Sequence, residues 1–348
     1  MEDLVDKIIL VPFRSAVLPH YVSLTWELWE FLSASHFYLQ IMSIPTNHPD
    51  PTLHALQTLL QETIHSIGNE DQVKKNLNTA KQLLDTARVR YDDGILSKFR
   101  LDGQVALVTG AGQGIGRALA HALGEAGCSV VIADINATTA ATVASELEAK
   151  NIQSFAVKVD ISKKEEVDAM MEAILAKFGN LHIACNNAGI ASQSKGEETE
   201  EVEWDTILGV NLKGTFHCCQ AEAKHMLKNG YGRIINTASL CAKTVVKPQC
   251  QVVYNSSKAA VVHMTKTLAT EWAGRGVTVN CISPGYVDTE LTRGEHLQDF
   301  RAQWIRDIPM KRLADVAELT GAVVYLASPL ASYTTGLDFI IDGGATLW

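Results

Sequence analysis

The chain has 348 residues, of which 47% are hydrophobic and 20% charged, and this ordinary globular composition excludes a disordered or fibrous protein. Its 30 Lys and Arg against 39 Asp and Glu give a net charge of -9, which argues against the basic surface that nucleic acids require. The early uncharged stretch 31–49 contains His, Pro, Ser and Asn, so we expect no membrane span. The seven Cys form no CxxC pair and no targeting segment is evident, which predicts reduced thiols and a cytoplasmic protein.

The first part of the chain differs in character from the rest. Residues 1–99 contain only two Gly, and we interpret them as an N-terminal extension. Apolar residues spaced by three and four predict a helical hairpin within 51–90. Its apolar stripe is either core against the main domain or an oligomerisation surface. Whether the natural chain starts at Met42 stays open.

From residue 100 onward, apolar β-branched runs alternate with amphipathic stretches, which is typical of βαβ units and a parallel sheet. We therefore predict one domain over 100–348, with a doubly wound α/β fold, a seven-stranded parallel sheet and helices on both faces. Ligands of such sheets bind at the carboxyl ends of the strands. The expected strands are 105–108, 130–133, 155–159, 182–185, 233–236, 278–282 and 339–341. The expected helices are 115–127, 138–150, 164–178, 201–228, 252–275 and 315–327.

A glycine-rich turn follows the first of these strands, in the run from Thr109 to Gly116. Gly110 allows a tight turn, Gly114 lets the backbone approach a pyrophosphate, and Gly116 allows close packing of helix against strand. Gln113 and Ile115 lie in the same turn. The phosphates of a dinucleotide would rest on the N-terminus of the following helix.

Asp134 ends the second strand, 18 residues beyond Gly116. An acid at this distance can accept hydrogen bonds from the adenosine ribose and would repel a 2′-phosphate. Because Gln113 is neutral, the balance favours NAD(H), with NADP(H) possible; Arg117 is the nearest cation in sequence. The alternative is that Asp134 is a helix N-cap or a turn acid.

Tyr254 and Lys258 are four residues apart in a predicted helix and therefore lie on one face of it. A nearby ammonium is expected to lower the pKa of the phenol, which would then act as general acid or base on an alcohol or carbonyl oxygen. Ser239 follows a strand and can hold that oxygen. Asn211 is a candidate anchor for a water that passes protons to Lys258.

With these motifs in order, residues from about 100 to 348 resemble the short-chain dehydrogenase/reductase family. The resemblance also includes the Asn186-to-Gly189 turn and Pro284-Gly285, while Ala242 departs from a common Gly. It implies Tyr254 as acid/base, Ser239 and Asn211 as catalytic partners, and Lys258 as a ligand of the nicotinamide ribose. It further implies cofactor contacts at Asp160, Ile161, Asn187, Gly285, Val287 and Thr289. It also implies a tetramer or dimer assembled through 201–228 and 252–275.

The run 247–263 is more narrowly similar to sorbose reductases and to the short-chain mannitol, arabinitol and gluconate dehydrogenases. Gln249 and Gln251 would suit a polyhydroxy substrate, unless they only shape a loop. This favours oxidoreduction of a sugar, polyol or sugar acid. The alternatives are a β-ketoacyl, steroid or aromatic ketone as substrate, or a nucleotide-binding scaffold without turnover. Since His182, His217 and His263 lack ligand spacing, no metal is expected. Cys241 and Cys250 are either reactive thiols or small apolar fillers near the site.

Overall fold

The computed structural model describes residues 94–294 and 297–347, together with six single positions between 58 and 79. The chain divides into two units, Met1–Ala87 and Arg88–Trp348, and the sheet lies in the second. The hairpin predicted within 51–90 lies outside the described residues except for those six positions. It therefore stays a prediction, as does the start at Met42.

The second unit is built on a seven-stranded parallel sheet, as predicted from the alternating pattern. Its strand order is β3-β2-β1-β4-β5-β6-β7, so the direction of winding reverses between β1 and β4. The strands are β1 (Val105–Thr109), β2 (Ser129–Asp134), β3 (Ser154–Lys158), β4 (Ile183–Asn186), β5 (Gly232–Thr237), β6 (Val277–Pro284) and β7 (Asp338–Ile341). Every residue of β1, β5 and β6 is buried, because helices cover both faces of the sheet.

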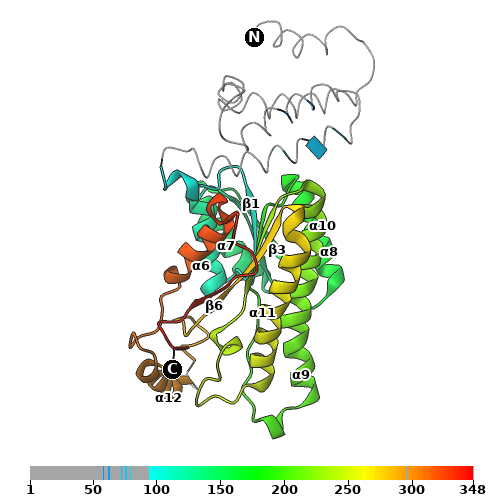
Figure 1. Cartoon of the computed structure of the whole chain (residues 1–348). Coiled ribbons are helices and arrows are strands. Elements are labelled where there is room, and N and C mark those ends of the chain that lie inside the picture. Colours follow the sequence, from blue (N-terminus) through cyan, green and yellow to red (C-terminus); the bar gives the residue numbers. More distant parts are fainter. Residues whose placement is uncertain are drawn as a thin grey trace, which may run out of the picture. The chain divides into compact units, whose positions relative to one another are not determined.

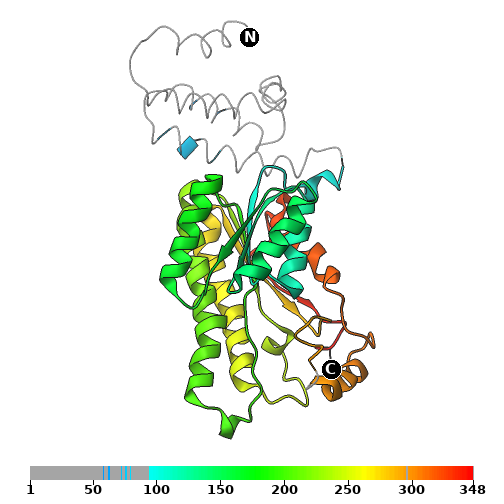
Figure 2. The same ribbon diagram turned by 180° about the vertical axis from the view of Figure 1, so that it is seen from behind.

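Helices cover the sheet in two layers, visible on either side of the strands in Figures 1 and 2. One layer consists of α6 (Gly114–Glu125), α7 (Ala137–Glu148) and α13 (Ala317–Ala327). The other consists of α8 (Lys164–Phe178), α10 (Thr215–Asn229) and α11 (Val252–Trp272), with α9 (Glu201–Leu208) packed beside α11. The change of layer between α7 and α8 leaves an open crevice at the carboxyl ends of β1 and β4.

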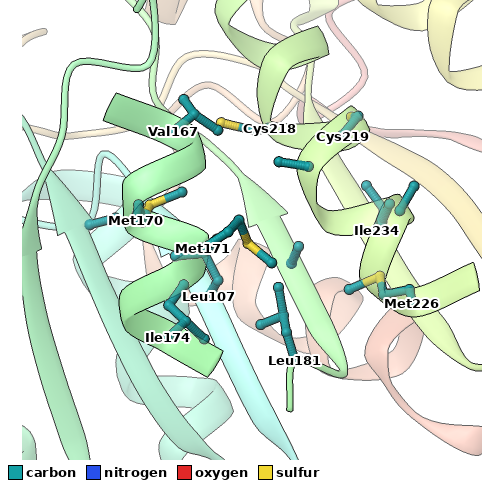
Figure 3. Close-up of a cluster of buried hydrophobic side chains, with 14 of the residues drawn as sticks. Leu107, Val167, Met170, Met171, Ile174, Leu181, Cys218, Cys219, Met226 and Ile234 are labelled. Atoms are coloured by element: carbon teal, nitrogen blue, oxygen red, sulfur yellow. The ribbon is translucent and has the colours of Figure 1, made fainter. Parts of the chain in front are cut away.

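Successive side chains of a strand point to opposite faces of the sheet and therefore belong to two separate hydrophobic cores. Leu107 of β1 packs among Met170, Met171 and Ile174 of α8, and Figure 3 shows these side chains facing one another. Its neighbour Val108 belongs to the core under α6, α7 and α13. Both cores are nearly free of solvent exposure, so the strand ends that form the crevice are rigidly held.

One carboxyl side chain is buried beside the core that α8 and α10 cover. Glu222 of α10 is fully buried, and its Oε2 accepts a hydrogen bond of 3.0 Å from Asn186 Nδ2. Its Oε1 has no hydrogen-bond partner among the described residues. Burial raises the pKa of Glu222 to about 8, so the carboxyl is protonated at neutral pH.

The structure differs from the predicted helices in three places. The helix expected over 201–228 is interrupted by a π-helical segment, η3 (Gly209–Gly214), which separates α9 from α10. Helix α12 (Gln298–Asp307) was not predicted from the sequence, and it lies near the C-terminus in Figure 1. The helix expected to end at 275 finishes as a short 3-10 turn, η5 (Ala273–Arg275). Within the described residues, no helix combines the length and apolarity needed to cross a membrane.

Candidate active site

Two adjoining clefts lie at the carboxyl ends of the strands. The first, of about 370 Å³, is called the glycine-loop cleft. It is lined by the predicted residues Gly110, Gln113, Gly114, Ile115, Gly116, Asp134, Asp160, Ile161, Asn187 and Thr289. The second, of about 350 Å³, is called the Tyr254 cleft. It is lined by Ser239, Gln249, Gln251, Tyr254, Lys258, Gly285 and Val287, and it shares Ile115, Asn187 and Thr289 with the first. The structure thus brings all predicted site residues except Asn211 to the walls of one continuous crevice.

The glycine loop has the shape that a diphosphate needs. Gly110 adopts a φ of +62°, which favours glycine, and Gly116 packs so closely that a Cβ there would lie 2.1 Å from the Gly110 carbonyl oxygen. Asn187 Nδ2 donates to the carbonyl oxygens of Thr109 and Gly110, at 3.1 and 3.2 Å. Gln113, the residue before α6, makes no side-chain capping hydrogen bond. Its side chain therefore leaves the backbone N–H groups in the first turn of α6 open to a ligand. These residues fit a bound anion.

Asp134 joins the end of β2 to the glycine loop. Its Oδ2 accepts from the Gly112 amide and its Oδ1 from the Asn136 amide, both at 2.9 Å. It is therefore a turn acid that also lines the cleft. It is not a helix N-cap, because Asn136 caps α7 by accepting from the amides of Thr138 and Thr139.

The glycine-loop cleft carries negative charge. Asp134, Asp160 and Glu290 line it, whereas no Lys or Arg among the described residues does. Arg117, the nearest cation in sequence, is paired with Glu146 at 2.8 Å. Hydrogen bonds from Ser162 lower the pKa of Asp160, which keeps that carboxyl ionised. This wall of the cleft therefore offers hydrogen-bond acceptors and, among the described residues, no cation for an anionic group.

Ser239, Tyr254 and Lys258 meet in the Tyr254 cleft from two elements. Ser239 follows β5, and its Oγ accepts a hydrogen bond of 3.2 Å from the Cys241 amide. Tyr254 and Lys258 project from the same face of α11, and Lys258 Nζ lies 5.8 Å from the centre of the Tyr254 ring. Lys258 Nζ also donates to the Thr237 carbonyl oxygen at 2.8 Å. The strand end and the helix therefore hold a hydroxyl, a phenol and an amine around one space.

The expected lowering of the Tyr254 pKa is not what the structure shows. Burial raises the pKa of Tyr254 to about 12, and a hydrogen bond with Ser239 opposes this only in part. Burial also lowers the pKa of Lys258 to about 8. With this pKa the phenol is protonated at neutral pH, which is the form that donates a proton to a ketone oxygen.

Asn211 lies in the π-helical segment η3 and lines neither cleft. Its Oδ1 accepts from the Ile190 amide at 2.8 Å, and its Nδ2 donates to the Ile190 carbonyl oxygen at 2.9 Å and to Ser257 Oγ at 3.1 Å. A Cβ at Gly189 would lie 3.2 Å from Asn211 Oδ1 and 3.3 Å from Lys258 Nζ. Asn211 thus clamps the segment after β4 beside Lys258, while its role in a proton relay stays a prediction.

The far wall of the Tyr254 cleft contains two aromatic residues that the sequence analysis did not single out, Tyr286 and Trp304. Tyr286 directly follows the Pro284-Gly285 pair, and Trp304 belongs to α12. The signal for α12 was present, because Leu297, Phe300, Trp304 and Ile308 recur at helical spacing. These apolar residues form a small core of their own against Tyr286.

The cysteines and histidines considered as candidates have structural surroundings that do not indicate catalysis. Cys241 lines the cleft and burial raises its pKa, which makes its thiol a poor nucleophile, whereas Cys250 is exposed. His182 Nδ1 accepts from the Val105 amide at 2.9 Å, and His217 contacts the Ile161 carbonyl oxygen, so both support the fold. No group of three or more His, Cys, Asp or Glu in the described part of the chain is arranged to hold a metal ion.

This chain is similar in sequence and in fold to known oxidoreductases. A family model described as enoyl-(acyl carrier protein) reductase matches residues 110–346. A D-threitol dehydrogenase of Mycolicibacterium smegmatis is 42% identical over 256 residues, which cover 72% of this chain and 95% of that protein. A 3-oxoacyl-(acyl-carrier-protein) reductase of Staphylococcus epidermidis is 36% identical over 240 residues, covering 69% and 97%. The crystal structure of a gluconate 5-dehydrogenase from Burkholderia cenocepacia J2315, in complex with NADP and tartrate, superposes with a TM-score of 0.70 at 35% identity, covering 73% and 100%.

Proposed function

The chain is a member of the short-chain dehydrogenase/reductase family and hence an NAD(P)-dependent oxidoreductase, and on that premise we propose that it interconverts a secondary alcohol and a ketone on a sugar, polyol or sugar acid. The observation that carries the proposal is the meeting of Ser239, Tyr254 and Lys258 with two glutamines in one cleft. The hydroxyl, phenol and amine of the first three residues supply the chemistry. Gln249 and Gln251 supply polar contacts for a hydroxylated substrate. The similarity to a D-threitol dehydrogenase and to a gluconate 5-dehydrogenase supports the same substrate class.

The residues of the cleft divide the reaction between them. A nicotinamide dinucleotide held by the glycine loop and Lys258 would supply or accept the hydride. Ser239 holds the carbonyl oxygen through its hydroxyl, and Tyr254 donates the phenolic proton to that oxygen. Lys258, protonated below pH of about 8, stabilises the phenolate that results and is positioned to return a proton. Alcohol oxidation requires the reverse transfer, so the high pKa of Tyr254 predicts that oxidation is favoured by alkaline conditions.

For the cofactor we propose NAD(H) in preference to NADP(H), with the pyrophosphate on the glycine loop and the N-terminus of α6. The acids Asp134, Asp160 and Glu290 and the pairing of Arg117 with Glu146 support this preference. The similar gluconate 5-dehydrogenase was crystallised in complex with NADP, which supports the other choice. Parallel titrations of the protein with NADH and NADPH, followed by cofactor fluorescence, decide the matter. Tighter binding of NADPH would contradict the role given to Asp134.

A second candidate function is reduction of a 3-oxoacyl substrate, because a reductase of that class is 36% identical to this chain. A steroid or an aromatic ketone, or nucleotide binding without turnover, are further alternatives with no specific observation in their favour. A substrate panel separates them: a ketose, a β-keto ester and an aromatic ketone, each with NADH and with NADPH. We expect the ketose to give the highest kcat/KM. Preference for the β-keto ester would favour the second candidate, and cofactor binding without any turnover would favour the scaffold.

We also propose a homo-oligomeric, cytoplasmic enzyme. Exposed apolar side chains on α9, α10 and α11 support self-association, and they include Trp204, Phe216 and Val252. The seven cysteines are all free, which supports a reducing compartment. A separate N-terminal unit over 1–99 and a catalytic domain over 100–348 remain our proposed organisation.

A further inference from the structure

Three residues without a part in proton transfer form a connected unit at the wall of the Tyr254 cleft. The Tyr286 hydroxyl donates a hydrogen bond of 3.1 Å to Gln249 Oε1. The Tyr286 ring stacks on Trp304, with 4.2 Å between ring centres and an angle of 14° between planes. Trp304 is 2% exposed and fixed in the small core of α12. Tyr286 is therefore held from one side by stacking and reaches Gln249 on the other.

This contact determines which part of the Gln249 side chain the substrate can meet. A carboxamide has an acceptor oxygen on one side and two N–H donors on the other. In the structure the Tyr286 hydroxyl donates to the Gln249 oxygen, and burial raises the pKa of Tyr286, so the phenol stays protonated and able to act as that donor. The Gln249 nitrogen makes no hydrogen bond to any described residue, so its N–H groups are left for a ligand of the cleft.

In Gln251 the amide nitrogen is the atom held by the protein, and the amide oxygen is left for a ligand. Its Nε2 donates to Cys241 Sγ at 3.2 Å and to Asn255 Oδ1 at 3.0 Å, which uses both of its N–H groups. Its Oε1 accepts no hydrogen bond from the part of the chain that the structure describes, and the residue lines the same cleft. The cleft therefore offers a ligand a donor at Gln249 and an acceptor at Gln251.

We propose that Tyr286 is a positioning residue that fixes Gln249 as a hydrogen-bond donor, and that Gln249 and Gln251 together select substrates with hydroxyl groups beside the reacting carbon. The inference rests on the proposed function and specifies its substrate. A hydroxyl oxygen accepts from Gln249, and a hydroxyl proton is donated to Gln251. A β-keto ester offers acceptors but no donor, and an aromatic ketone has neither group next to its carbonyl. The opposed polarity of the two amides therefore favours polyols and ketoses.

A double-mutant cycle tests whether Tyr286 acts through Gln249. The variants are Gln249→Leu, Tyr286→Phe and the two combined, and the readout is the ratio of kcat/KM for a four-carbon ketose to that for 2-butanone. Gln249→Leu should lower this ratio about five- to tenfold, because one hydrogen bond to the substrate is lost. Tyr286→Phe keeps the stacked ring and should lower it about threefold or more, since the amide is free to turn. In the Gln249→Leu background, Tyr286→Phe should cause no further decrease.

Two further variants control for the loss of the N–H donor alone and for a Tyr→Phe change outside the cleft. Gln249→Met keeps a side chain of similar length but offers no N–H, so it should lower the ratio as Gln249→Leu does. Tyr333→Phe makes the same chemical change at a fully exposed tyrosine and should leave the ratio unchanged. Thermal unfolding of every variant shows which of them are folded.

The outcomes separate this inference from the proposed function. If the wild type reduces the ketose but Tyr286→Phe leaves its ratio unchanged, or lowers it equally in both backgrounds, the positioning role is wrong and the proposed function survives. If the wild type reduces 2-butanone or a β-keto ester but no ketose, both are overturned.

Discussion

At the scale of single residues, the chemistry of the cleft depends on burial as much as on residue type. The sequence predicted that Ser239, Tyr254 and Lys258 act together because their order and spacing are specific, and the fold brings all three to one cleft, while their catalytic roles stay a prediction. The direction of the Tyr254 pKa could not, because it is set by how much of the phenol the folded chain removes from water. The same holds for Tyr286 and Gln249, whose contact joins residues 37 positions apart.

Glu222 gives a prediction about stability. In the unfolded chain its carboxyl ionises near pH 4.5, whereas in the fold burial raises its pKa to about 8. Below pH 4.5 the group is protonated in both states and has no effect on stability. Between these values the folded chain keeps a proton that the unfolded chain releases, so the free energy of unfolding should fall as pH rises.

Glu222→Gln should remove this pH dependence and stabilise the protein at pH 8 by on the order of 4 kcal/mol. Melting temperatures of the wild type and the variant between pH 5 and pH 9 measure the effect. Glu172→Gln, at an exposed position of α8, is the matched control and should follow the wild-type curve. Parallel curves for Glu222→Gln and the wild type would show that Glu222 does not retain its proton in the fold.

At the scale of elements, the glycine loop gives the clearest prediction. In Gly116→Ala the new methyl group would lie 2.1 Å from the Gly110 carbonyl oxygen and 2.6 Å from Asn187 Nδ2, so the loop must move. We expect a destabilisation of about 1–3 kcal/mol and at least tenfold weaker cofactor binding. Fluorescence titration with NADH and a melting curve measure the two effects.

Gly321→Ala is the control for this change, because a Cβ there meets nothing within 4 Å and the site is inside α13. Alanine is the better helix former, so this variant should be as stable as the wild type or up to about 1 kcal/mol more stable. Wild-type cofactor affinity in Gly116→Ala would mean that the loop is not the phosphate site.

The elements themselves were predictable to differing degrees. All seven strands were identified to within two residues at each end, because buried parallel strands are continuous apolar runs bounded by turns. The π-helical segment η3 was not, since a change from α to π hydrogen bonding leaves the spacing of apolar residues almost unaltered. Yet this segment contains Asn211 and directs it to the backbone of Ile190.

At the scale of the whole molecule, the exposed apolar residues on neighbouring helices α9, α10 and α11 predict self-association. Trp204 is 40% exposed and Phe216 39% exposed, values that are high for large apolar side chains. Sedimentation analysis should give a dimer or tetramer, and Phe216→Glu should shift the population toward smaller species. Tyr333→Glu, which changes a fully exposed aromatic residue that belongs to none of these helices, is the control. A monomeric wild type at micromolar concentration would contradict the proposal.

We propose that this crevice carries out proton-coupled hydride transfer with Tyr254 as the acid/base, and removal of the Tyr254 hydroxyl is the decisive experiment. Steady-state ketose reduction is measured for the wild type, for Tyr254→Phe and for Tyr333→Phe at saturating cofactor, with cofactor binding checked by fluorescence. We expect Tyr254→Phe to lose about 10²-fold or more in kcat while still binding cofactor, and Tyr333→Phe to keep wild-type rates. Retention of more than about a tenth of the wild-type kcat by Tyr254→Phe would contradict the assignment of the phenol as proton donor.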